Sequence, residues 1–337
     1  GRSGSILEQN VGSIPGDMWF NRENNSLNFT WESSSYSGGA WSTGGSTLIG
    51  RAGNTGTGTQ HATLAMGIGW PGKGETEHYD GAAWSAGGLM ITHRGYGARA
   101  GTQNAGQVVG GTGYAAPANT SGGQANREYT EQYNGTTWSE VADTPNGWRE
   151  VAGDGTQNAA WIGGGNNTPG GDECSTITLE WDGSSWSEGG ALPIGKRRTN
   201  GAGQVYAALN FGGHPNDNIT YEYNGSVWSA GGDMTDGEVD STGAGSQGAA
   251  FAVPGKTHTE EYNGTTWSST ALASRGAAPA NGSTETNSAG TPSAGILFGG
   301  THPGAGTYSQ LTEEYAGSGI YKAYMVCALT GSQSGSV

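Results

Sequence analysis

Positive charge is scarce in this 337-residue chain. Lys and Arg together number 14, against 29 Asp and Glu, which gives a formal net charge of −15. Binding to nucleic acid depends on cationic side chains that neutralise phosphates, so the composition argues against a nucleic-acid partner. Long apolar runs are also missing, and none approaches the roughly 18–20 residues of a membrane-spanning helix. We therefore expect neither nucleic-acid binding nor membrane insertion.

Cysteine is nearly absent, and histidine is sparse. The two cysteines, Cys174 and Cys327, lie far apart and match no metal-ligand spacing. Two unpaired thiols are the favoured interpretation, and a bridge between the last strand and an earlier segment stays open. We expect no metal and no cofactor, because the histidines are scattered along the chain. They are His61, His78, His93, His214, His258 and His302.

Hydrophobic residues make up only 33% of the chain, whereas about 45–50% is usual for globular domains. With 66 glycines, that composition alone would indicate disorder. The 12 Trp and 14 Tyr argue the other way, because many recur in register and large aromatic rings bury much surface. The sequence therefore predicts a folded, glycine-rich, all-β protein.

The aromatic residues follow a recurring pattern, Tyr-x-Gly-x-x-Trp, of which Tyr262 to Trp267 is the clearest copy. Successive copies begin about 40 to 50 residues apart, a period typical of a β-propeller array. In one copy Trp181 takes the place of Tyr, and the last copy has lost its Trp. The aromatic positions of the pattern are Tyr36, Trp41, Tyr79, Trp84, Tyr133, Trp138, Trp181, Trp186, Tyr223, Trp228, Tyr262, Trp267 and Tyr315.

Each repeat has four parts. A Gly/Ala-rich segment is followed by an apolar segment ending in two glycines, as in Leu209–Gly213, then by the Tyr segment and the Trp segment. Asn-Gly or Asp-Gly usually separates the last two parts and predicts a two-residue hairpin turn. The unit therefore predicts four short antiparallel strands, which form one propeller blade. The small residues suit the innermost strand, and the rings suit the gaps between blades.

We predict an all-β β-propeller of four-stranded antiparallel blades over residues 16–326. Seven blades are favoured, the first formed by residues 16–42 and followed by six repeat units; six blades with a separate N-terminal hairpin are the alternative. Residues 1–15 are predicted to form an N-terminal arm, and residues 327–337 a C-terminal tail. Ring closure should use strands from both chain ends, because an open ring leaves unpaired strand edges.

The glycine pair, the Tyr and the Trp at a fixed distance resemble the kelch-type propeller repeat. Gly101–Asn104 (Gly-Thr-Gln-Asn) is similar to repeats in virion and tail proteins of marine bacteriophages, and Gly16–Asn21 resembles a segment of phage fibre proteins. The resemblance implies a location in the virion, or otherwise outside the cell. It also implies other virion proteins or host-surface glycans as partners, and a homo-oligomer within a particle. The Asp-box of sialidases does not fit, because Tyr262 stands where its Asp should be.

No catalytic constellation emerges. Kelch-type propellers include galactose oxidase, but the Tyr–Cys and His copper ligands of that enzyme have no counterpart here. Arginines follow the Trp segments in register, which favours a structural role, such as binding loop carbonyls, over a converging anion site. They are Arg94, Arg149, Arg198 and Arg275. The acidic pairs Glu260-Glu261 and Glu313-Glu314 are expected on solvated strand faces rather than in acid–base catalysis.

The loops differ in a way that points to recognition. Hairpin turns within each unit stay short and fall on one face, whereas the other connections vary in length and lie on the opposite face. Tyr114, Trp148 and His214 are the candidate ligand-binding residues on these loops. We expect a non-enzymatic structural and recognition module of a phage virion or tail fibre. A secreted carbohydrate-binding lectin is the alternative, and a kelch-type oxidase or glycan-active enzyme is less favoured.

Overall fold

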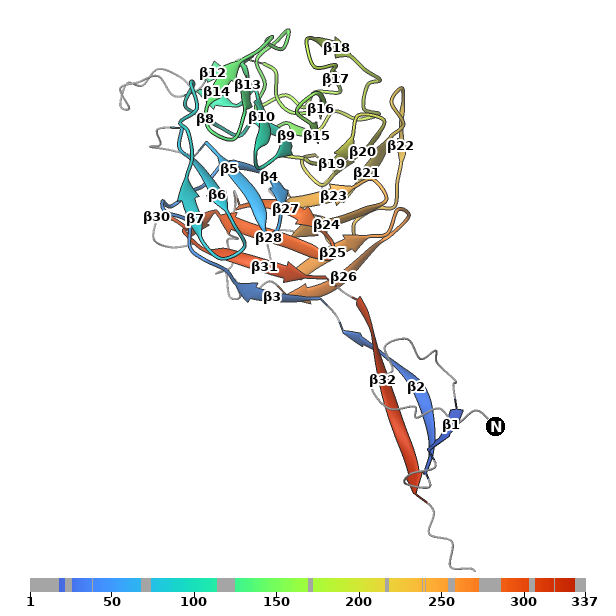
Figure 1. Ribbon diagram of the computed structural model, residues 1–337. Helices are drawn as coiled ribbons and strands as arrows, with labels where there is room; N and C mark the ends of the chain where they lie inside the picture. The colour runs from blue at the N-terminus through green and yellow to red at the C-terminus, as the bar shows by residue number, and fades with distance from the viewer. Residues whose placement is uncertain are drawn as a thin grey trace, which may run out of the picture. The chain divides into compact units, whose positions relative to one another are not determined.

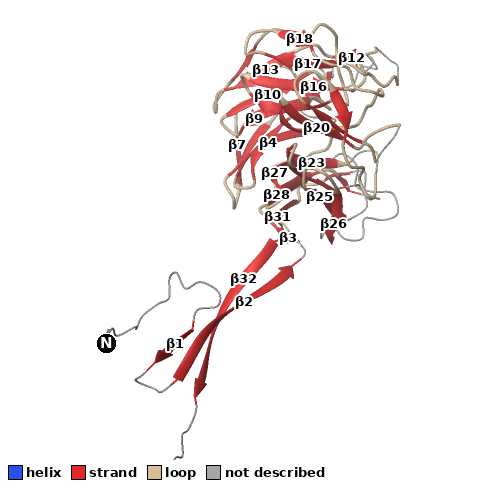
Figure 2. Ribbon diagram, turned by 90° about the vertical axis from the view of Figure 1, so that its right-hand side faces the viewer, coloured by secondary structure: helices blue, strands red, loops and turns tan. Residues whose placement is uncertain are grey.

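The computed structural model describes residues 18–21, 26–37, 39–67, 74–113, 125–168, 172–215, 218–237, 239, 241–253, 258–272, 286–302, 307–317 and 319–330. The chain divides into two units, one made of Gly1–Gly38 and Ser318–Val337, the other of Gly39–Gly317. Every regular element in the described ranges is a β-strand (Figure 2). No helix capable of crossing a membrane is found in those ranges. The all-β prediction is confirmed.

The larger unit contains six four-stranded antiparallel sheets, here called blades 1 to 6 (Figure 1). Blade 1 consists of β4 (Thr55–Thr59), β5 (Ala62–Met66), β6 (Thr76–Tyr79) and β7 (Trp84–Ala86). Blade 2 consists of β9 (Ala98–Thr102), β10 (Ala105–Val109), β13 (Thr130–Tyr133) and β14 (Trp138–Glu140). Blade 3 consists of β15 (Ala152–Thr156), β16 (Ala159–Gly163), β17 (Thr178–Trp181) and β18 (Trp186–Glu188).

Blade 4 consists of β19 (Asn200–Gln204), β20 (Ala207–Phe211), β21 (Thr220–Tyr223) and β22 (Trp228–Ala230). Blade 5 consists of β23 (Thr242–Ser246), β24 (Ala249–Val253), β25 (His258–Tyr262) and β26 (Trp267–Leu272). Blade 6 consists of β27 (Thr286–Thr291), β28 (Ala294–Gly299), β31 (Thr312–Ala316) and β3 (Ala40–Thr43). The connections add the short strands β8 (Arg94–Gly95), β11 (Thr112–Gly113), β12 (Ala125–Asn126), β29 (Thr301–His302) and β30 (Thr307–Tyr308).

The first strands of the blades form a closed ring around a central channel. The order of neighbours is β4, β9, β15, β19, β23, β27 and again β4. Closure is completed at the outer edge of blade 6, where β3 pairs with β31 from the other end of the unit. The prediction that ring closure uses strands from both chain ends is thus confirmed, and it leaves no blade with an unfilled outer position.

The favoured count of seven blades is wrong, and the alternative of six is correct. Trp41 pairs directly with Tyr315, so the first Trp and the last Tyr of the pattern belong to one blade. Tyr36 lies outside the propeller, in a strand that pairs with the C-terminal segment. In the linear sequence these two halves look like separate repeats, because one blade is assembled from segments more than 270 residues apart.

The smaller unit is a three-stranded antiparallel sheet made from both ends of the chain. It contains β1 (Met18–Asn21), β2 (Ser26–Ser37) and β32 (Gly319–Thr330), in the order β1-β2-β32. β2 and β32 pair along all 12 of their residues. A first blade over residues 16–42 is therefore not formed, and β32 extends into the predicted tail. The predicted arm 1–15 and the end of the tail, 331–337, lie outside the described residues.

The hydrophobic core is divided among the six gaps between blades, and Trp occupies each gap. The indole Nε1 of every blade's Trp donates to a Thr hydroxyl of the preceding blade, at 2.8 to 3.1 Å. The pairs are Trp84–Thr312, Trp138–Thr76, Trp186–Thr130, Trp228–Thr178, Trp267–Thr220 and Trp41–Thr259. The prediction that rings fill the wedges between sheets is confirmed, and the indole of each of these six Trp side chains makes a hydrogen bond.

A second ring of bonds links the Tyr of one blade to the preceding blade. Tyr262 donates to Glu222 at 2.5 Å, and Tyr315 donates to Glu261 at 2.7 Å. The neighbouring residues Glu260 and Glu313 are 0% and 4% exposed. The expectation that the acidic pairs lie on solvated strand faces is therefore wrong: one carboxylate of each pair is buried, and the other accepts a bond from the next blade.

The Gly-Thr-Gln segments also join blades. Gln103 Nε2 donates to the carbonyls of Thr63 and Tyr79 in blade 1, and Gln157 Nε2 donates to those of Gly106 and Tyr133 in blade 2. A two-pronged donor at this turn satisfies carbonyls from two neighbouring strands at once. The motif is therefore accounted for by packing between blades.

The Asn-Gly turns are longer than predicted. Tyr133 pairs with Trp138, which leaves a four-residue loop instead of a two-residue turn. The Asn134 carboxamide accepts hydrogen bonds from the amides of Thr136 and Thr137, and Gly135 has φ of 91°. The Asn and Gly are thus used as expected for turn residues, but within an Asx-type loop.

Candidate ligand site at the mouth of the central channel

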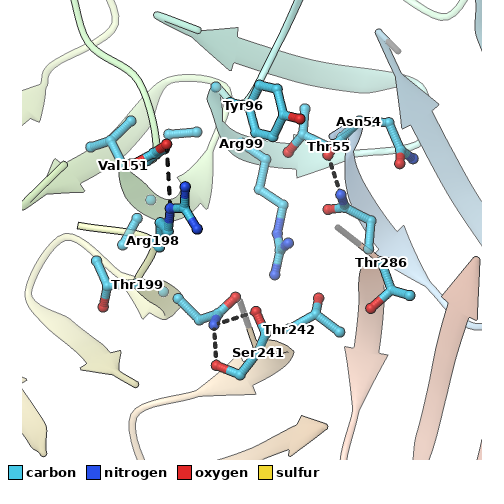
Figure 3. Close-up of a pocket in the computed structure, with 18 residues that line it drawn as sticks. Asn54, Thr55, Tyr96, Arg99, Val151, Arg198, Thr199, Ser241, Thr242 and Thr286 are labelled. Atoms are coloured by element: carbon cyan, nitrogen blue, oxygen red, sulfur yellow. Dashed lines mark hydrogen bonds and ion pairs between the residues drawn. The ribbon is translucent and has the colours of Figure 1, made fainter. Parts of the chain in front are cut away.

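The first residues of the six innermost strands surround one cavity (Figure 3). Because each of these strands follows a connection from another blade, the cavity lies on the face that carries those connections. Its volume is about 120 Å³, below the roughly 300–1,000 Å³ typical of sites for drug-sized ligands. Residues from all six blades line it, among them Thr55, Arg99, Asn200, Thr242 and Thr286. Binding sites of rigid scaffolds favour such loop-bearing faces. The cavity is therefore the candidate site, and its size limits the ligand to a small molecule or one terminal group.

A belt of backbone hydrogen bonds forms part of the rim. The amide of Tyr96 donates to Gly53, that of Glu150 to Tyr96, and that of Arg198 to Glu150, at 2.8 to 2.9 Å. These residues occupy equivalent places in blades 1 to 4, and all have positive φ: Gly53 62°, Tyr96 60°, Glu150 54° and Arg198 52°. Only glycine adopts this conformation without strain. Side chains are thus retained at three positions where glycine would be easier to accommodate.

Strained residues of this kind cluster at functional sites when the surrounding structure holds them in place. Tyr96, Glu150 and Arg198 all line the cavity. Arg197 Nη1 donates to Glu150 at 3.0 Å, and Arg198 Nε lies 3.4 Å from the same carboxylate. Glu150 is therefore held between two guanidinium groups, while Arg198 remains 40% exposed. The rim offers one aromatic ring and one accessible cation.

Arg99 occupies the centre of the cavity (Figure 3). It belongs to β9 of blade 2, and its Nη2 donates to the Gly243 carbonyl of blade 5, on the opposite side of the ring. Burial lowers the pKa of Arg99, and the nearby carboxylate of Asp154 raises it. A guanidinium keeps its proton at neutral pH even where burial lowers its pKa. The channel mouth therefore carries a fixed positive charge on its axis.

Asp154 is an acidic residue of an innermost strand, close enough to Arg99 to influence its pKa. It belongs to β15 of blade 3, and its Oδ2 accepts a hydrogen bond of 2.8 Å from the Gly203 amide of blade 4. Burial raises the pKa of Asp154 to about 6, although Arg99 and the amides of Gly155 and Gly203 oppose the rise. A desolvated carboxylate with an incomplete set of partners behaves in this way. The channel therefore holds an arginine and a carboxyl group that do not form a direct ion pair.

Polar side chains tie neighbouring blades together around the mouth. Asn200 Nδ2 donates to the carbonyl and the hydroxyl of Ser241, both at 2.8 Å. The hydroxyls of Thr242 and Ser288 lie 2.8 Å apart, and the Asn287 amide donates to the Asn54 carbonyl. Because these bonds cross from blade to blade, the cavity wall is largely preformed before any ligand arrives.

The residues predicted from the loops do not form this site. Trp148, proposed as an exposed ligand-binding residue, is 1% exposed and packs with Val109 and Leu179 in the gap between blades 2 and 3. That proposal is wrong, because the ring fills a core position instead of a loop. His214 is exposed, but it does not line the cavity; its Nδ1 lies 3.6 Å from Cys174 Sγ. Cys174 is a free thiol. Tyr114 lies outside the described residues.

The predicted arginines have mainly structural roles. Arg94 is fully buried, where its Nη1 pairs with Glu131 at 2.6 Å and its Nη2 donates to the Val108 carbonyl. Arg149 pairs with Asp172 near the rim. Arg198 is the exception, since it also lines the cavity. Arg275 lies outside the described residues.

Sequence reasoning missed the residues nearest the axis. Arg99 stands where blades 1, 3, 4 and 5 have glycine, and Asp154 stands where four blades have alanine. The sequence signal for these two residues was a charged side chain at a position where the first strands of the other blades have small residues. The described residues contain no cluster of three or more His, Cys, Asp and Glu side chains suited to a metal ion.

Comparisons with known proteins identify the fold. No protein-family model matches the chain, and no curated protein matches it. Among solved structures, the chain is similar to YjhT, with a TM-score of 0.63 and 14% sequence identity. That match covers 82% of this chain and 99% of the YjhT chain. At this identity the similarity concerns the β-propeller architecture alone.

Proposed function

We propose that this protein is a non-enzymatic recognition module, and that the channel mouth is its ligand site. The observation that carries the proposal is the convergence of unlike polar side chains from six otherwise similar blades on one cavity. In the gaps between blades the same residue types recur, because they do the same packing work. At the mouth Tyr96, Arg99, Glu150 and Arg198 have no such repetition, and three of them keep a strained backbone. Selection for binding explains that asymmetry better than selection for stability.

We further propose that the module belongs to a phage virion or tail fibre and binds the host-cell surface or other virion proteins. The support is the resemblance of its repeats, and of Gly16–Asn21, to such proteins. The pairing of β2 with β32 adds to this, because it gathers both chain ends into one sheet, separate from the propeller unit. An attachment segment of this kind suits a module carried by a larger assembly. Mass spectrometry of purified particles tests the placement, and absence of this chain from them would refute it.

A secreted lectin remains the second candidate, because the same cavity accounts for it. Its polar walls and the ring of Tyr96 suit a sugar, with hydroxyl groups on the walls and the ring against a carbon face. The distinction from the first candidate concerns location, not the site. An oxidase or glycan-active enzyme is the least favoured candidate.

A glycan array with the purified protein tests the binding proposal. We expect a small set of glycans to bind, and Arg198→Ala to weaken that binding. Tyr206→Ala is the matched control, because Tyr206 is 75% exposed and lies in a hairpin turn away from the cavity. Turnover of any bound glycan would contradict the non-enzymatic assignment. Equal loss of binding in both variants would show that the channel mouth is not the ligand site.

A further inference from the structure

The charges in the cavity are unevenly satisfied. Glu150 already pairs with Arg197 and Arg198. Arg99, in contrast, donates to a single protein acceptor among the described residues, the carbonyl of Gly243. A guanidinium carries five N–H donors, so most of its donor capacity is not used by the protein. None of its nitrogen atoms is among the buried, unpartnered polar atoms of the described chain, so the remaining N–H groups are accessible from the cavity.

The position of Arg99 fixes what it can bind. The Nη2 bond to Gly243 holds the guanidinium across the channel, so little side-chain freedom is left to lose when a ligand binds. A planar guanidinium matches a carboxylate through two parallel N–H···O bonds, and such charge-assisted bonds are stronger than neutral ones. Asp154 faces the same channel without reaching Arg99 as an ion pair. The guanidinium therefore has an open place for an external carboxylate.

The wall around Arg99 suits hydroxyl groups. The Thr55 hydroxyl has no protein partner in the described ranges, and Asn200 uses its Nδ2 for Ser241 while its Oδ1 keeps its capacity to accept. Tyr96 adds an aromatic surface at the rim (Figure 3). With a volume of about 120 Å³, the cavity has room for the carboxylate end of one sugar unit and not for a chain of sugars.

We infer that the ligand at the channel mouth is an acidic sugar residue, whose carboxylate binds Arg99 and whose hydroxyl groups meet the Thr55, Asn200 and Thr242 wall. This inference rests on the proposed function and specifies its ligand class. The chain as a whole is strongly acidic, so an anionic ligand gains nothing from the overall charge. Surface charges are screened within about 8–10 Å at physiological salt, whereas Arg99 acts at contact distance.

Calorimetric titration of the full chain with D-glucuronate, and with D-glucose as the neutral counterpart, tests the inference. We expect glucuronate to bind and glucose to bind at least about 10-fold more weakly, the scale of one hydrogen bond to a charged group. Arg99→Gln should abolish that preference, and Arg99→Lys should restore only part of it, because an ammonium lacks the planar fork. Unchanged glucuronate affinity in Arg99→Gln would overturn the inference.

A second variant guards against misfolding of the Arg99 substitutions. Asp154→Asn removes the nearby negative charge and keeps an acceptor for the Gly203 amide, so it should strengthen glucuronate binding at pH 7.5. No change or weaker binding would count against Arg99 as the carboxylate partner.

Sulfate competing as strongly as glucuronate would show a general anion site and overturn the sugar class. Neutral glycans binding on the array while glucuronate fails would refute this inference alone; no glycan binding at all would also refute the channel mouth as a glycan site.

Discussion

The gaps between blades and the mouth of the channel are built by opposite rules. In each of the six gaps a Trp indole donates to a Thr hydroxyl of the preceding blade, so one solution is used six times. At the mouth, equivalent positions hold Gly53, Tyr96, Glu150 and Arg198, which differ in size and charge. Repetition marks the residues that hold the ring together, and at the mouth departure from repetition marks the residues available for binding.

A buried position that holds charged residues in blade 2 holds apolar residues in blade 3. Where blade 2 has the buried pair Arg94 and Glu131, blade 3 has Trp148 and Leu179, packed in one apolar cluster. Glu131 also accepts the amides of Ile91 and Thr92. The residue equivalent to Ile91 in blade 3 is Pro145, which has no amide N–H to satisfy. The acid is thus absent where one of its donors is absent.

The largest expected effect comes from breaking a repeated gap contact. Trp267 is 5% exposed, packs on Phe211 with ring centroids 5.1 Å apart, and donates to Thr220. Trp267→Ala should lower the free energy of unfolding by about 3–5 kcal/mol, since it leaves a cavity between blades 4 and 5. Urea denaturation measures the loss. Ser268→Ala, at the exposed neighbouring position, is the control and should change little.

Measuring ligand affinity in Trp267→Ala tests whether the gaps and the channel mouth are independent. At temperatures where Trp267→Ala is still folded, its affinity for the ligand of the channel mouth should equal that of the unmodified protein. A loss of affinity comparable to the loss of stability would mean that gaps and mouth are not separable.

The next effect concerns the buried ion pair of blade 2. Arg94→Met should cost about 3 kcal/mol or more, because it leaves Glu131 charged and unpaired in a dry site. The double variant Arg94→Trp with Glu131→Leu introduces the apolar residues of blade 3 and should recover part of that loss, although the amides of Ile91 and Thr92 then lack their carboxylate acceptor. Thermal unfolding of both variants provides the measurement. If the double variant were less stable than Arg94→Met, the two blades would not be interchangeable at this position.

The gaps were largely predictable from the sequence because their chemistry repeats. The spacing between Tyr262 and Trp267 recurs in every complete copy of the pattern. The period of that pattern was enough to predict blades with aromatic rings between them. The count failed at Tyr36, Trp41 and Tyr315, because a strand from one chain end completes the last blade. The linear pattern does not show that the incomplete copies at the two ends of the chain combine into a single blade.

The mouth was not predictable by the same reasoning. Arg99 and Asp154 are single departures within columns of small residues, and their significance depends on six strands meeting at one axis. Trp148 misled for the opposite reason. An aromatic residue after a variable connection suggested an exposed loop, whereas the structure places it at the buried position that arginine occupies in blade 2.

A smaller effect should appear at Asp154. Its pKa is about 6 in the fold against 3.8 ordinarily, so between pH 4 and 6 the folded protein holds a proton that the unfolded chain has lost. The contribution of this group to the free energy of unfolding therefore falls as pH rises through that window and stays lower above pH 6. Partial exposure to channel water limits the change to about 1–2 kcal/mol.

Asp154→Asn tests that contribution. The stability of the variant relative to the unmodified protein should increase between pH 4 and pH 7. The increase is partly offset because Arg99 loses a compensating negative charge. Urea denaturation at several pH values measures the difference. Glu188→Gln, at an exposed position, serves as the control for removing a negative charge. A constant difference across the pH range would contradict a raised pKa at Asp154.

The smallest expected effect isolates backbone strain at the rim. Arg198 has φ of 52°, and its side chain is 40% exposed, so replacing it removes little packing. Arg198→Ala loses the side chain and keeps the strain, whereas Arg198→Gly loses both. The glycine variant should therefore be more stable than the alanine variant by about 1 kcal/mol, the usual cost of a left-handed conformation in a residue with a Cβ. Both variants should weaken ligand binding equally, because the guanidinium is absent from each. If alanine were as stable as glycine here, the rim would hold no strain, and the argument that its side chains are kept for binding would lose its structural basis.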